Sequence, residues 1–475
     1  MSAPLMELLI IFLIIANGFT VFFFAQFIYY GLFSYFYHWR KRYSMQLNQG
    51  LLDKLAEKHS TVMPSVTVII PALNEASLIS NTINTFVKMN YPKDKYRLLL
   101  VLDDKELFAK SFNETTHGFV EEEMEKYNKL HGSDFISYTS VPVNFDGNFH
   151  GEITQSPVKS NKPRALNWVL SMIPEHTQVL GFYDADSQPD PDTLLYVAQK
   201  YITRNGKPLL IQGPVVQVRN YFNLKVMNKI YALSQAVTHE WFLPVLLRRL
   251  PFIGGTNFFI EPYLLQDVEG FEQEALSEDL ELGCRLYIEK DVWPKFLPFI
   301  ATEQTPPNYK SFFRQRVRWA SGYMQVIKYM LIQEGSLFKR FRIVSMLFLY
   351  GVFPWVTAQI LSVTTLGILV LSFLGITHAI AEIPYGIKMF SIVMNFFYFV
   401  FLIVYLHHSI GKYYIPAKAS GHKSSWLIKY LELSILPVAA LFGGLPYTYG
   451  FFAFIFGRGQ ATWVKTPRSA EAKLL

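Results

Sequence analysis

The spacing of apolar residues divides the chain into three parts. From Leu8 to about Tyr37 nearly every residue is apolar or aromatic and none is charged, over more than the roughly 20 residues that cross a bilayer. Three more apolar blocks follow later in the chain, at 343–374, 389–406 and 433–456. The stretch from 42 to 342 contains no apolar run of that length. The pattern predicts a polar domain inserted between membrane helices.

The polar domain alternates strand-like and helix-like patterns, as in an α/β fold. A β-branched run at 65–70 ends at Pro71, and helical periodicity at 76–89 ends before a Pro-containing break. Residues 96–102 and 179–183 have the pattern of two further buried strands, and an aspartate follows each of them. Ligands bind beyond the carboxyl ends of parallel strands, so these acids are expected at a site. The Asn-, Gly-, Ser- and Pro-rich residues 144–163 predict a long loop.

The composition and the charges near the N-terminus support a membrane protein. Hydrophobic residues make up 51% of the 475 residues, and 41 of them are Phe, which argues against a wholly soluble chain. The first seven residues carry no Lys or Arg, so we predict an uncleaved anchor and not a secretory signal. The basic cluster Arg40-Lys41-Arg42 then predicts a cytoplasmic domain, with the N-terminus outside the plasma membrane.

The net charge and the cysteine content limit which binding partners and which kinds of site the sequence predicts. The net charge of +7 is modest and most basic residues flank the apolar segments, so a membrane-lipid surface is implied and nucleic acid is not. The single cysteine, Cys284, excludes an intrachain disulfide and is expected to be a helix-packing residue. His239 lacks companions at metal-ligand spacing. Protein partners are not indicated.

The last apolar blocks leave the number of membrane spans open. Basic residues predict a cytoplasmic loop before the final block and a cytoplasmic tail after it, which a single crossing cannot satisfy. These residues are Lys412, Lys418 and Lys423 in the loop and Arg458, Lys465 and Arg468 in the tail. The loop around Glu382 has no basic cluster and is expected outside. Residues 427–456, broken at Gly443-Gly444-Leu445-Pro446, are therefore interpreted as two short or re-entrant helices.

One motif favours a metal site. Asp184 and Asp186 lie two residues apart directly after a predicted strand, so both carboxylates can approach a hard divalent cation, with Mg²⁺ or Mn²⁺ the best suited. Such an ion would neutralise charge on a diphosphate leaving group. The alternative is an ordinary acidic turn.

Other polar motifs have structural and functional interpretations side by side. Asn74-Glu75 and Asp103-Asp104 can bind a nucleotide, or they can be turn and helix-capping residues. Glu278-Asp279 can supply a general base, or simply suit the positive end of the helix dipole. A predicted helix carries Gln315-Arg316-Val317-Arg318-Trp319, which offers an arginine for diphosphate and an indole for a sugar face. The same helix also has the pattern of a basic amphipathic helix on the membrane surface.

The order of these motifs resembles that of family-2 glycosyltransferases. In sequence they are Asn74-Glu75, Asp103-Asp104, Lys162-Pro163-Arg164-Ala165-Leu166-Asn167, Asp184-Ala185-Asp186, Ser277-Glu278-Asp279 and Gln315-Arg316-Val317-Arg318-Trp319. The resemblance covers Val66 to about Gly322. The last motif and the flanking apolar blocks look like the processive branch of cellulose, chitin and hyaluronan synthases.

The resemblance implies a fold, an activity and residue roles. The fold is a GT-A-type, Rossmann-like domain at 40–342, between an anchor at 1–39 and membrane helices at 343–457, with a tail at 458–475. The reaction is an inverting, metal-dependent hexosyl transfer in which Asp279 is the base and Asp184 and Asp186 hold the metal. Implied donor ligands are Asn74, Glu75, Asp103, Asp104, Lys162, Asp184, Gln315, Arg318 and Trp319. Implied acceptor ligands are Gly255, Thr256, Asn257, Glu278 and Trp319.

Two positions depart from the family pattern, and three functions stay open. Ser277 stands where threonine is usual, and Lys105 follows the aspartate pair where a small residue is common. The leading hypothesis is extension of a β-linked polysaccharide from a UDP-sugar, coupled to export. The second is transfer of one sugar to a lipid acceptor, as in ceramide glucosyltransferases and related mannosyltransferases. The third is a transporter or scaffold that only binds nucleotide.

Overall fold

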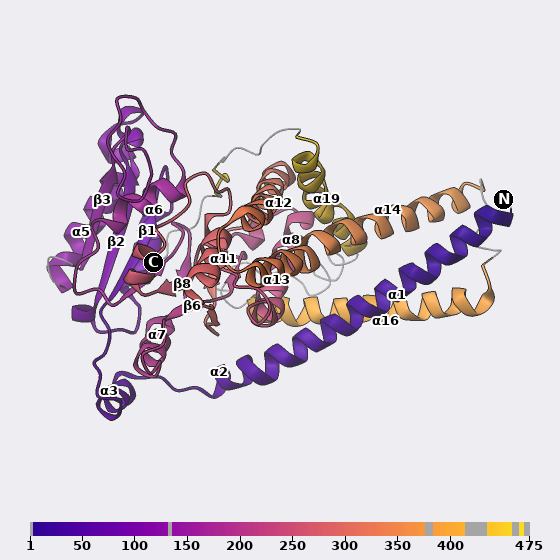
Figure 1. The fold of residues 1–475 in the computed structure, drawn as a ribbon, viewed down its shortest axis with the longest axis horizontal. Coiled ribbons are helices and arrows are strands. Elements are labelled where there is room, and N and C mark those ends of the chain that lie inside the picture. The colour runs from indigo at the N-terminus through magenta and orange to yellow at the C-terminus, as the bar shows by residue number, and fades with distance from the viewer. Residues whose placement is uncertain (1–2, 132–134, 376–382, 414–434, 458–464, 470–475) are drawn as a thin grey trace.

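The computed structural model describes residues 3–131, 135–375, 383–413, 435–457 and 465–469. A mixed sheet lies at one end of the molecule, and three long apolar helices extend from the other (Figure 1). The sheet has seven strands in the order β3-β2-β1-β4-β8-β6-β9. Their bounds are β1 Val66–Pro71, β2 Tyr96–Asp103, β3 Ile136–Val141, β4 Val179–Phe182, β6 Leu210–Gln212, β8 Phe258–Ile260 and β9 Lys295–Phe296.

The predicted α/β domain and its first strands are confirmed. Strands β3, β2, β1 and β4 are parallel, whereas β8 runs antiparallel to both of its neighbours. Alternate residues of β1 enter two separate cores because a strand presents successive side chains to opposite faces. Val68 and Ile70 pack under one helical layer, and Ile69 packs under the other. The sheet is therefore covered on both faces.

Helices cover the sheet in two layers. One layer contains α3 Gln49–Lys58, α4 Ile79–Val87, α5 Thr116–His131 and α7 Thr193–Ile202. The other contains α6 Lys162–Leu170, α10 Pro262–Gln266 and α11 Glu278–Lys290. Helix α4 starts three residues later than the periodicity predicts. Helix α6 begins at Lys162, inside the predicted loop, because Asn161 caps it by accepting from the backbone N–H of Arg164 at 2.9 Å.

A small second sheet lies beside the end of β4. It joins β5 Gln188–Pro189, β10 Ala301–Thr302 and β7 Val215–Val216. The pairing of β10 with β5 brings the residues after Thr302 next to the segment that follows β4. Residues more than a hundred positions apart thereby share one corner of the domain.

A group of helices lies between the sheet and the long apolar helices (Figure 1). Its members are α8 Val226–Val237, η6 Thr238–Phe242, α9 Leu243–Leu246, α12 Tyr309–Ile332, α13 Leu337–Leu347, η7 Phe348–Val352 and α19 Leu436–Ile455. Helix α12 packs against α19, and Gln315 and Arg316 on it are buried. The basic motif thus does not lie wholly on a surface, in contrast to the amphipathic interpretation.

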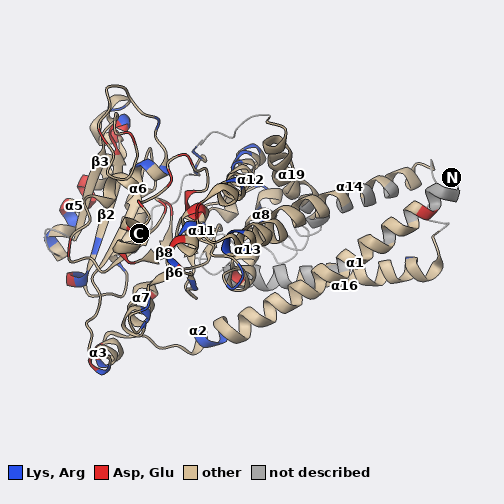
Figure 2. Cartoon of the chain, viewed as in Figure 1, with Lys and Arg blue, Asp and Glu red and all other residues tan. Residues whose placement is uncertain are grey.

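The long helices carry few charges (Figure 2). They are α1 Ala3–Ser34, which continues through η1 Tyr35–Trp39 and α2 Arg40–Ser44, together with α14 Phe353–Phe373 and α16 Tyr385–Tyr413. Among the described residues, the helical stretches Ile10–Ser44 and Leu337–Ile360 are long and apolar enough to cross a membrane. Lys418, Lys423, Glu382 and Arg458 lie outside the described residues.

The predicted break in the last apolar block is wrong for the described residues 436–455. Helix α19 runs without interruption through Gly443 and Pro446. Proline cannot donate to the carbonyl four residues before it, which would leave that of Phe442 without a partner. The hydroxyl of Tyr309 on α12 donates to the carbonyl of Phe442 at 3.0 Å, so packing against α12 replaces the missing helical hydrogen bond.

Candidate functional site

The predicted polar motifs meet at one edge of the sheet. β2 and β3 lie on one side of β1, and β4 lies on the other. The chain continues from β1 to β2 on one side and from β4 to the later strands on the other, and ligands of such sheets bind beyond the carboxyl ends of the strands at this point. Asn74 and Glu75 follow β1, Asp103 ends β2, and Asp184 follows β4. This edge is the candidate active site.

An acidic cluster forms where the two sheets meet. Carboxylate oxygens of Asp184, Asp186 and Glu303 all lie within 4.8 Å of one another. The backbone N–H of Gln304 donates to Asp186 at 3.0 Å, and Ser187 donates to Glu303 at 2.5 Å. Burial and the charges of Asp186 and Asp184 raise the pKa of Glu303 to about 8. The cluster has the oxygen ligands that Mg²⁺ or Mn²⁺ prefers, and its buried negative charge calls for a cation.

Lys162 connects this cluster to the next motif. Its ammonium group contacts the carboxylate of Asp184 and donates to the carbonyl of Gly255 at 2.7 Å. Burial would lower the pKa of Lys162, but the carboxylates of Asp184, Glu278 and Asp279 together raise it. The first turn of α6 therefore places one cation between the acidic cluster and the start of α11.

Glu278 and Asp279 begin α11 on the other side of this lysine. Burial and the neighbouring charge of Asp279 raise the pKa of Glu278 to about 7, and burial also raises the pKa of Asp279. Gly255 has a positive φ of 72°, and a Cβ atom there would lie 2.6 Å from the Asp279 carboxylate. The backbone of this loop therefore lies directly against the predicted base.

Helix α12 packs across the start of α11. A Cβ atom at Gly322 would lie 2.3 Å from the Ser277 hydroxyl, so the two segments are in close backbone contact. Gln325 on α12 accepts from the backbone N–H of Leu276 at 2.9 Å. Arg318 donates to the carbonyl of Leu276 at 3.4 Å. The last predicted motif and the predicted base are thus held together by the packing of two helices.

The aromatic residue of that motif is partly covered. The guanidinium of Arg316 lies 3.8 Å from the ring centre of Trp319, one turn away on the same helix. Trp319 itself is half-buried. Its predicted stacking on a sugar must therefore use the remainder of the indole surface.

The aspartate pair after β2 is divided between two environments. Asp103 is buried and accepts from Arg164 at 3.0 Å and from Ser160 at 2.6 Å. Asp104 accepts from Ser140 on the neighbouring strand. The Lys105 ammonium donates to the carbonyl of Val158, so it is directed to the long loop. Asp103 therefore fixes α6 to the sheet, while Asp104 keeps the nucleotide role as a prediction.

Two predicted acceptor ligands make their hydrogen bonds inside the fold. The hydroxyl of Thr256 accepts from the backbone N–H of Asp184 at 3.2 Å. The Asn257 amide accepts from Tyr183 at 2.8 Å and donates to two backbone carbonyls at 3.0 Å. These contacts tie the Gly255 loop to the end of β4. The acceptor role of both side chains stays a prediction.

Two discounted side chains are structural. Cys284 is fully buried in an apolar cluster, as predicted. His239 accepts from the backbone N–H of Val215 at 3.2 Å, and no metal-ligand group forms around it among the described residues. The packing role predicted for Cys284 agrees with its burial, and the His239 ring makes a hydrogen bond within the fold.

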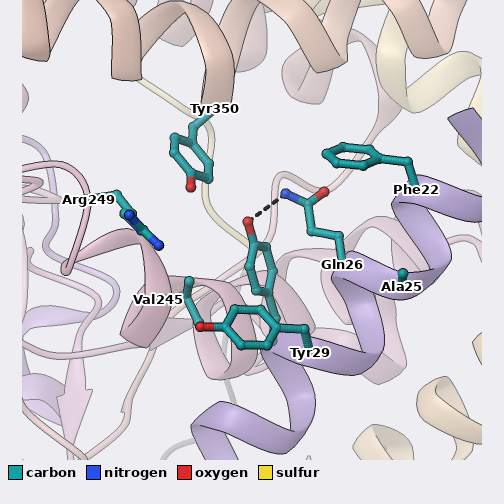
Figure 3. A pocket seen from close by; sticks show the side chains of 8 residues that line it. Phe22, Ala25, Gln26, Tyr29, Val245, Arg249 and Tyr350 are labelled. Carbon is teal, nitrogen blue, oxygen red and sulfur yellow. Dashed lines mark hydrogen bonds between the residues drawn. The ribbon is translucent and has the colours of Figure 1, made fainter.

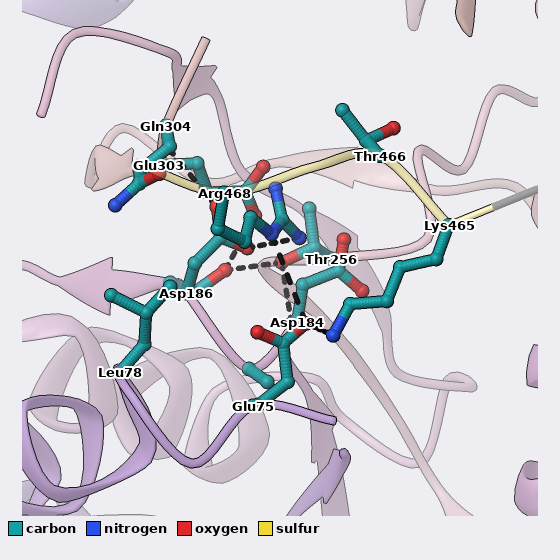
Figure 4. Close-up of polar contacts among 12 residues, drawn as sticks. Glu75, Leu78, Asp184, Asp186, Thr256, Glu303, Gln304, Lys465, Thr466 and Arg468 are labelled. Atoms are coloured by element: carbon teal, nitrogen blue, oxygen red, sulfur yellow. Dashed lines mark hydrogen bonds and ion pairs between the residues drawn. The ribbon is translucent and has the colours of Figure 1, made fainter. Parts of the chain in front are cut away.

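Three site residues were missed from the sequence, and Figure 4 shows them together. Glu303 completes the acidic cluster, although it follows a two-residue strand with no recognisable motif. Lys465 forms an ion pair with Glu75 at 2.9 Å, and Arg468 forms one with Asp186 at 2.8 Å. The two basic residues were assigned only to membrane topology, because the sequence has no signal that the tail returns to the sheet.

Comparisons with known proteins find similarity to glycosyltransferases. Residues 182–407 match the family model described as glycosyl transferase family group 2. The probable glycosyltransferase YdaM of Bacillus subtilis is 29% identical over 296 residues, which are 61% of this chain and 62% of that protein. The beta-monoglucosyldiacylglycerol synthase of Trichormus variabilis is 22% identical over 271 residues, 56% of this chain and 51% of that protein. The chain thus spans between half and two thirds of the length of these relatives.

The mannosyltransferase PcManGT from Pyrobaculum calidifontis, solved with GDP-Man and Mn²⁺, aligns with a TM-score of 0.46 at 14% identity. That alignment covers 94% of this chain and all of the solved one. The family match begins at the end of β4 and includes the Asp184-Ala185-Asp186, Glu278-Asp279 and Trp319 motifs. Residues 182–407 of this chain are therefore similar to the glycosyl transferase family group 2.

Proposed function

We propose that the chain is an inverting hexosyltransferase with a GT-A-type fold, acting on a nucleotide-sugar donor at a membrane surface. The observation that carries this proposal is the chain of contacts from the acidic cluster through Lys162 and Gly255 to Asp279. The diphosphate of the donor would lie beside the acidic cluster, and the acceptor hydroxyl would lie beside Asp279. The donor sugar would then lie between the two. The geometry suits a single displacement.

In this mechanism Asp279 accepts the proton of the acceptor hydroxyl as its oxygen attacks the anomeric carbon. The new glycosidic C–O bond forms on the face opposite to the departing nucleoside diphosphate, so the configuration inverts. A general base is most effective when its pKa lies near the working pH. The raised pKa values of Glu278 and Asp279 fit that requirement.

The leaving group needs positive charge. Asp184, Asp186 and Glu303 would hold Mg²⁺ or Mn²⁺, which when bound neutralises charge on the diphosphate. Lys162 and Arg318 would supply further positive charge on the side of Asp279. Asp104 would bind the nucleotide. All of these residues lie at the sheet edge or on α12.

For the acceptor we propose a growing β-linked polysaccharide, extended on the cytoplasmic side and passed along the membrane helices. Aromatic rings beside α12 support this choice, because a sugar ring stacks on an aromatic face. Trp355 stacks on Tyr447 with ring centres 5.0 Å apart, and Tyr323 lies 5.1 Å from Trp355. Two nearby aromatic residues belong to other contacts, since Phe353 contacts Phe19 and Tyr449 contacts Phe313.

A lipid acceptor is the second candidate, and a pocket favours it. The pocket holds about 310 Å³ between α1 and η7, and aromatic rings and a basic group face it (Figure 3). It is lined by Phe22, Ala25, Gln26, Tyr29, Tyr30, Val245, Arg249 and Tyr350. Such a lining suits an amphiphile with a polar head. One of the relatives is named for a glycolipid product, monoglucosyldiacylglycerol.

Product analysis tests both proposals. Membranes containing the protein are incubated with single UDP- or GDP-sugars and Mg²⁺ or Mn²⁺, and the products are sized and digested with linkage-specific hydrolases. Long products support the polysaccharide, and one sugar on lipid supports the second candidate. Asp279→Asn is expected to reduce transfer by about 10²- to 10⁴-fold. Asp291→Asn, at the exposed other end of α11, is the matched control.

Full transfer activity in Asp279→Asn would refute the mechanism. Absence of transfer from every donor would favour a nucleotide-binding transporter or scaffold.

A further inference from the structure

A short segment near the end of the chain lies inside the candidate active site. Residues 465–469, here called the strap, run beside the acidic cluster and contact Glu75 after β1 and Asp186 after β4 (Figure 4). Nearly 400 positions separate the strap from the residues after β1 that it contacts. The contacts are polar along its length, so the strap is held by a specific set of partners.

One end of the strap is fixed to the loop after β1. The Lys465 ammonium forms an ion pair with Glu75 at 2.9 Å. It also donates to the carbonyl oxygens of Leu73 at 2.6 Å and Asn74 at 2.5 Å. Three acceptors therefore surround a single ammonium group, which matches its three donors.

The other end is fixed beside the acidic cluster. The backbone N–H of Ser469 donates to the Gln304 side chain at 2.8 Å, and the same side chain donates back to the Ser469 carbonyl at 2.9 Å. Asn220 donates to the Ser469 hydroxyl at 3.1 Å. Because Gln304 directly follows Glu303, these bonds hold the strap against the cluster.

Between these two ends, the Arg468 guanidinium occupies the place of a cation. It lies 2.8 Å from a carboxylate oxygen of Asp186, whose side chain is fully buried, and 3.8 Å from Glu75. A guanidinium has five N–H donors, yet the Nε of Arg468 is buried without a hydrogen-bond acceptor. The pairing thus neutralises the carboxylate and leaves part of the arginine unsatisfied. A group that binds Asp186 more strongly can therefore displace Arg468.

A divalent cation and this guanidinium compete for Asp186. Mg²⁺ and Mn²⁺ bind carboxylate oxygens at roughly 2.1 Å, and two positive groups on one carboxylate repel each other strongly in a buried site. We propose that the strap is an autoinhibitory device in which Arg468 takes the position of the divalent cation until the ion displaces it. This inference rests on the proposed cation site at Asp184, Asp186 and Glu303.

The proposal makes a quantitative statement about metal binding. If only the fraction of molecules with an open strap can bind the ion, the apparent dissociation constant increases in inverse proportion to that fraction. A strap that is closed in about nine molecules of ten weakens binding roughly tenfold. Removal of the Arg468 side chain would restore the intrinsic affinity.

The test measures Mn²⁺ binding to the full-length protein in detergent, without donor, from the electron paramagnetic resonance signal of free Mn²⁺. Arg468→Met is expected to bind Mn²⁺ about tenfold more tightly than the natural protein. Lys207→Ala, which removes one charge from an exposed turn after α7, controls for net charge and is expected to bind like the natural protein. Equal affinities of Arg468→Met and the natural protein would overturn the proposal.

A disulfide lock separates displacement from a simple charge effect. In Asn220→Cys/Ser469→Cys the two cysteines replace a hydrogen-bonded pair, and the natural Cys284 is buried. The oxidised lock is expected to bind Mn²⁺ at least tenfold more weakly than the same protein after reduction. Asn220→Cys alone shows whether loss of the amide disturbs the fold. Equal binding by the oxidised and reduced forms would overturn the proposal.

Sugar transfer measured in parallel keeps the two proposals distinguishable. A protein that transfers sugar but shows equal Mn²⁺ affinity with and without Arg468 refutes the strap alone. A protein that transfers no sugar from any donor refutes the proposed function, and the Mn²⁺ comparison still tests the strap. If no variant binds Mn²⁺, the strap proposal is overturned.

Discussion

Gly322 on α12 is predicted to be essential for the rate of transfer but not for folding. A Cβ atom at this position would lie 2.3 Å from the Ser277 hydroxyl and 3.0 Å from the Ser277 backbone N and Cβ. Ordinary contacts between such atoms are about 3.5 Å, so Gly322→Ala forces α11 and α12 apart by roughly 0.5–1 Å. Rotation of the hydroxyl relieves the first contact but not the other two.

The effects on stability and on rate differ in size. Alanine gains about 1 kcal/mol over glycine in a helix, and overpacking costs about 1–3 kcal/mol, so the free energy of unfolding changes little. The rate is more sensitive, because Asp279 follows Ser277 by two residues and Arg318 lies one turn before Gly322. A displacement of about 1 Å can reduce a rate by roughly 10²-fold. We therefore expect kcat to fall about 10- to 100-fold while Tm changes by only a few degrees.

The assay measures how fast each purified variant releases nucleoside diphosphate from the donor, and it compares only variants that are folded like the natural protein. Gly367→Ala on α14 is the control, since it is also a helical glycine and a Cβ there meets no atom within 4 Å. Ser277→Gly combined with Gly322→Ala removes the clashing side chain and is expected to recover part of the lost rate. A kcat for Gly322→Ala equal to that of the natural protein would refute the close-contact reasoning.

Three further predictions concern charge. The rate of transfer should decline as the pH falls through about 7, because the Glu278 and Asp279 pair takes up a proton there. Glu278→Gln removes the negative charge beside Asp279, so a pH–rate profile of this variant should show the decline at lower pH. A metal chelator should abolish transfer. In a Mn²⁺ titration, Asp186→Asn should raise the Mn²⁺ concentration that gives half-maximal rate about tenfold or more. An unchanged Mn²⁺ titration would contradict the cation site. Arg164→Met removes the ion-pair partner of the buried Asp103 and should cost about 3–5 kcal/mol in denaturant unfolding. Lys126→Met removes a mostly exposed ammonium group from beside Glu123 and should cost less than about 1 kcal/mol.

The sequence alone was sufficient for the elements and motifs whose signals are local. The run at 65–70 is a strand because it is β-branched and ends in proline, and its alternate residues fill two cores. The order of the motifs was also enough to predict a family, and the match to residues 182–407 supports it. These signals depend on residues that are neighbours along the chain, or on their sequence order.

Local signals were misleading where packing replaced a local preference. Gly443 and Pro446 predicted a break, but a hydroxyl on α12 satisfies the carbonyl that the proline leaves free. Arg316 belongs to a basic helix by its sequence, yet it is buried and donates to the side chain of Gln217. In both cases the deciding partner belongs to a different part of the chain or fold.

Only the tertiary structure decided which charged residues form the site. Glu303 joins Asp184 and Asp186 because β10 pairs with β5, and Arg468 joins them because the strap returns to the sheet. In the sequence these two residues look like any other solvated charge. Burial of a charge is favourable only when an opposite charge or an ion compensates it. For Asp186 that compensation comes from Arg468, more than a hundred positions away, and no periodicity along the chain indicates it.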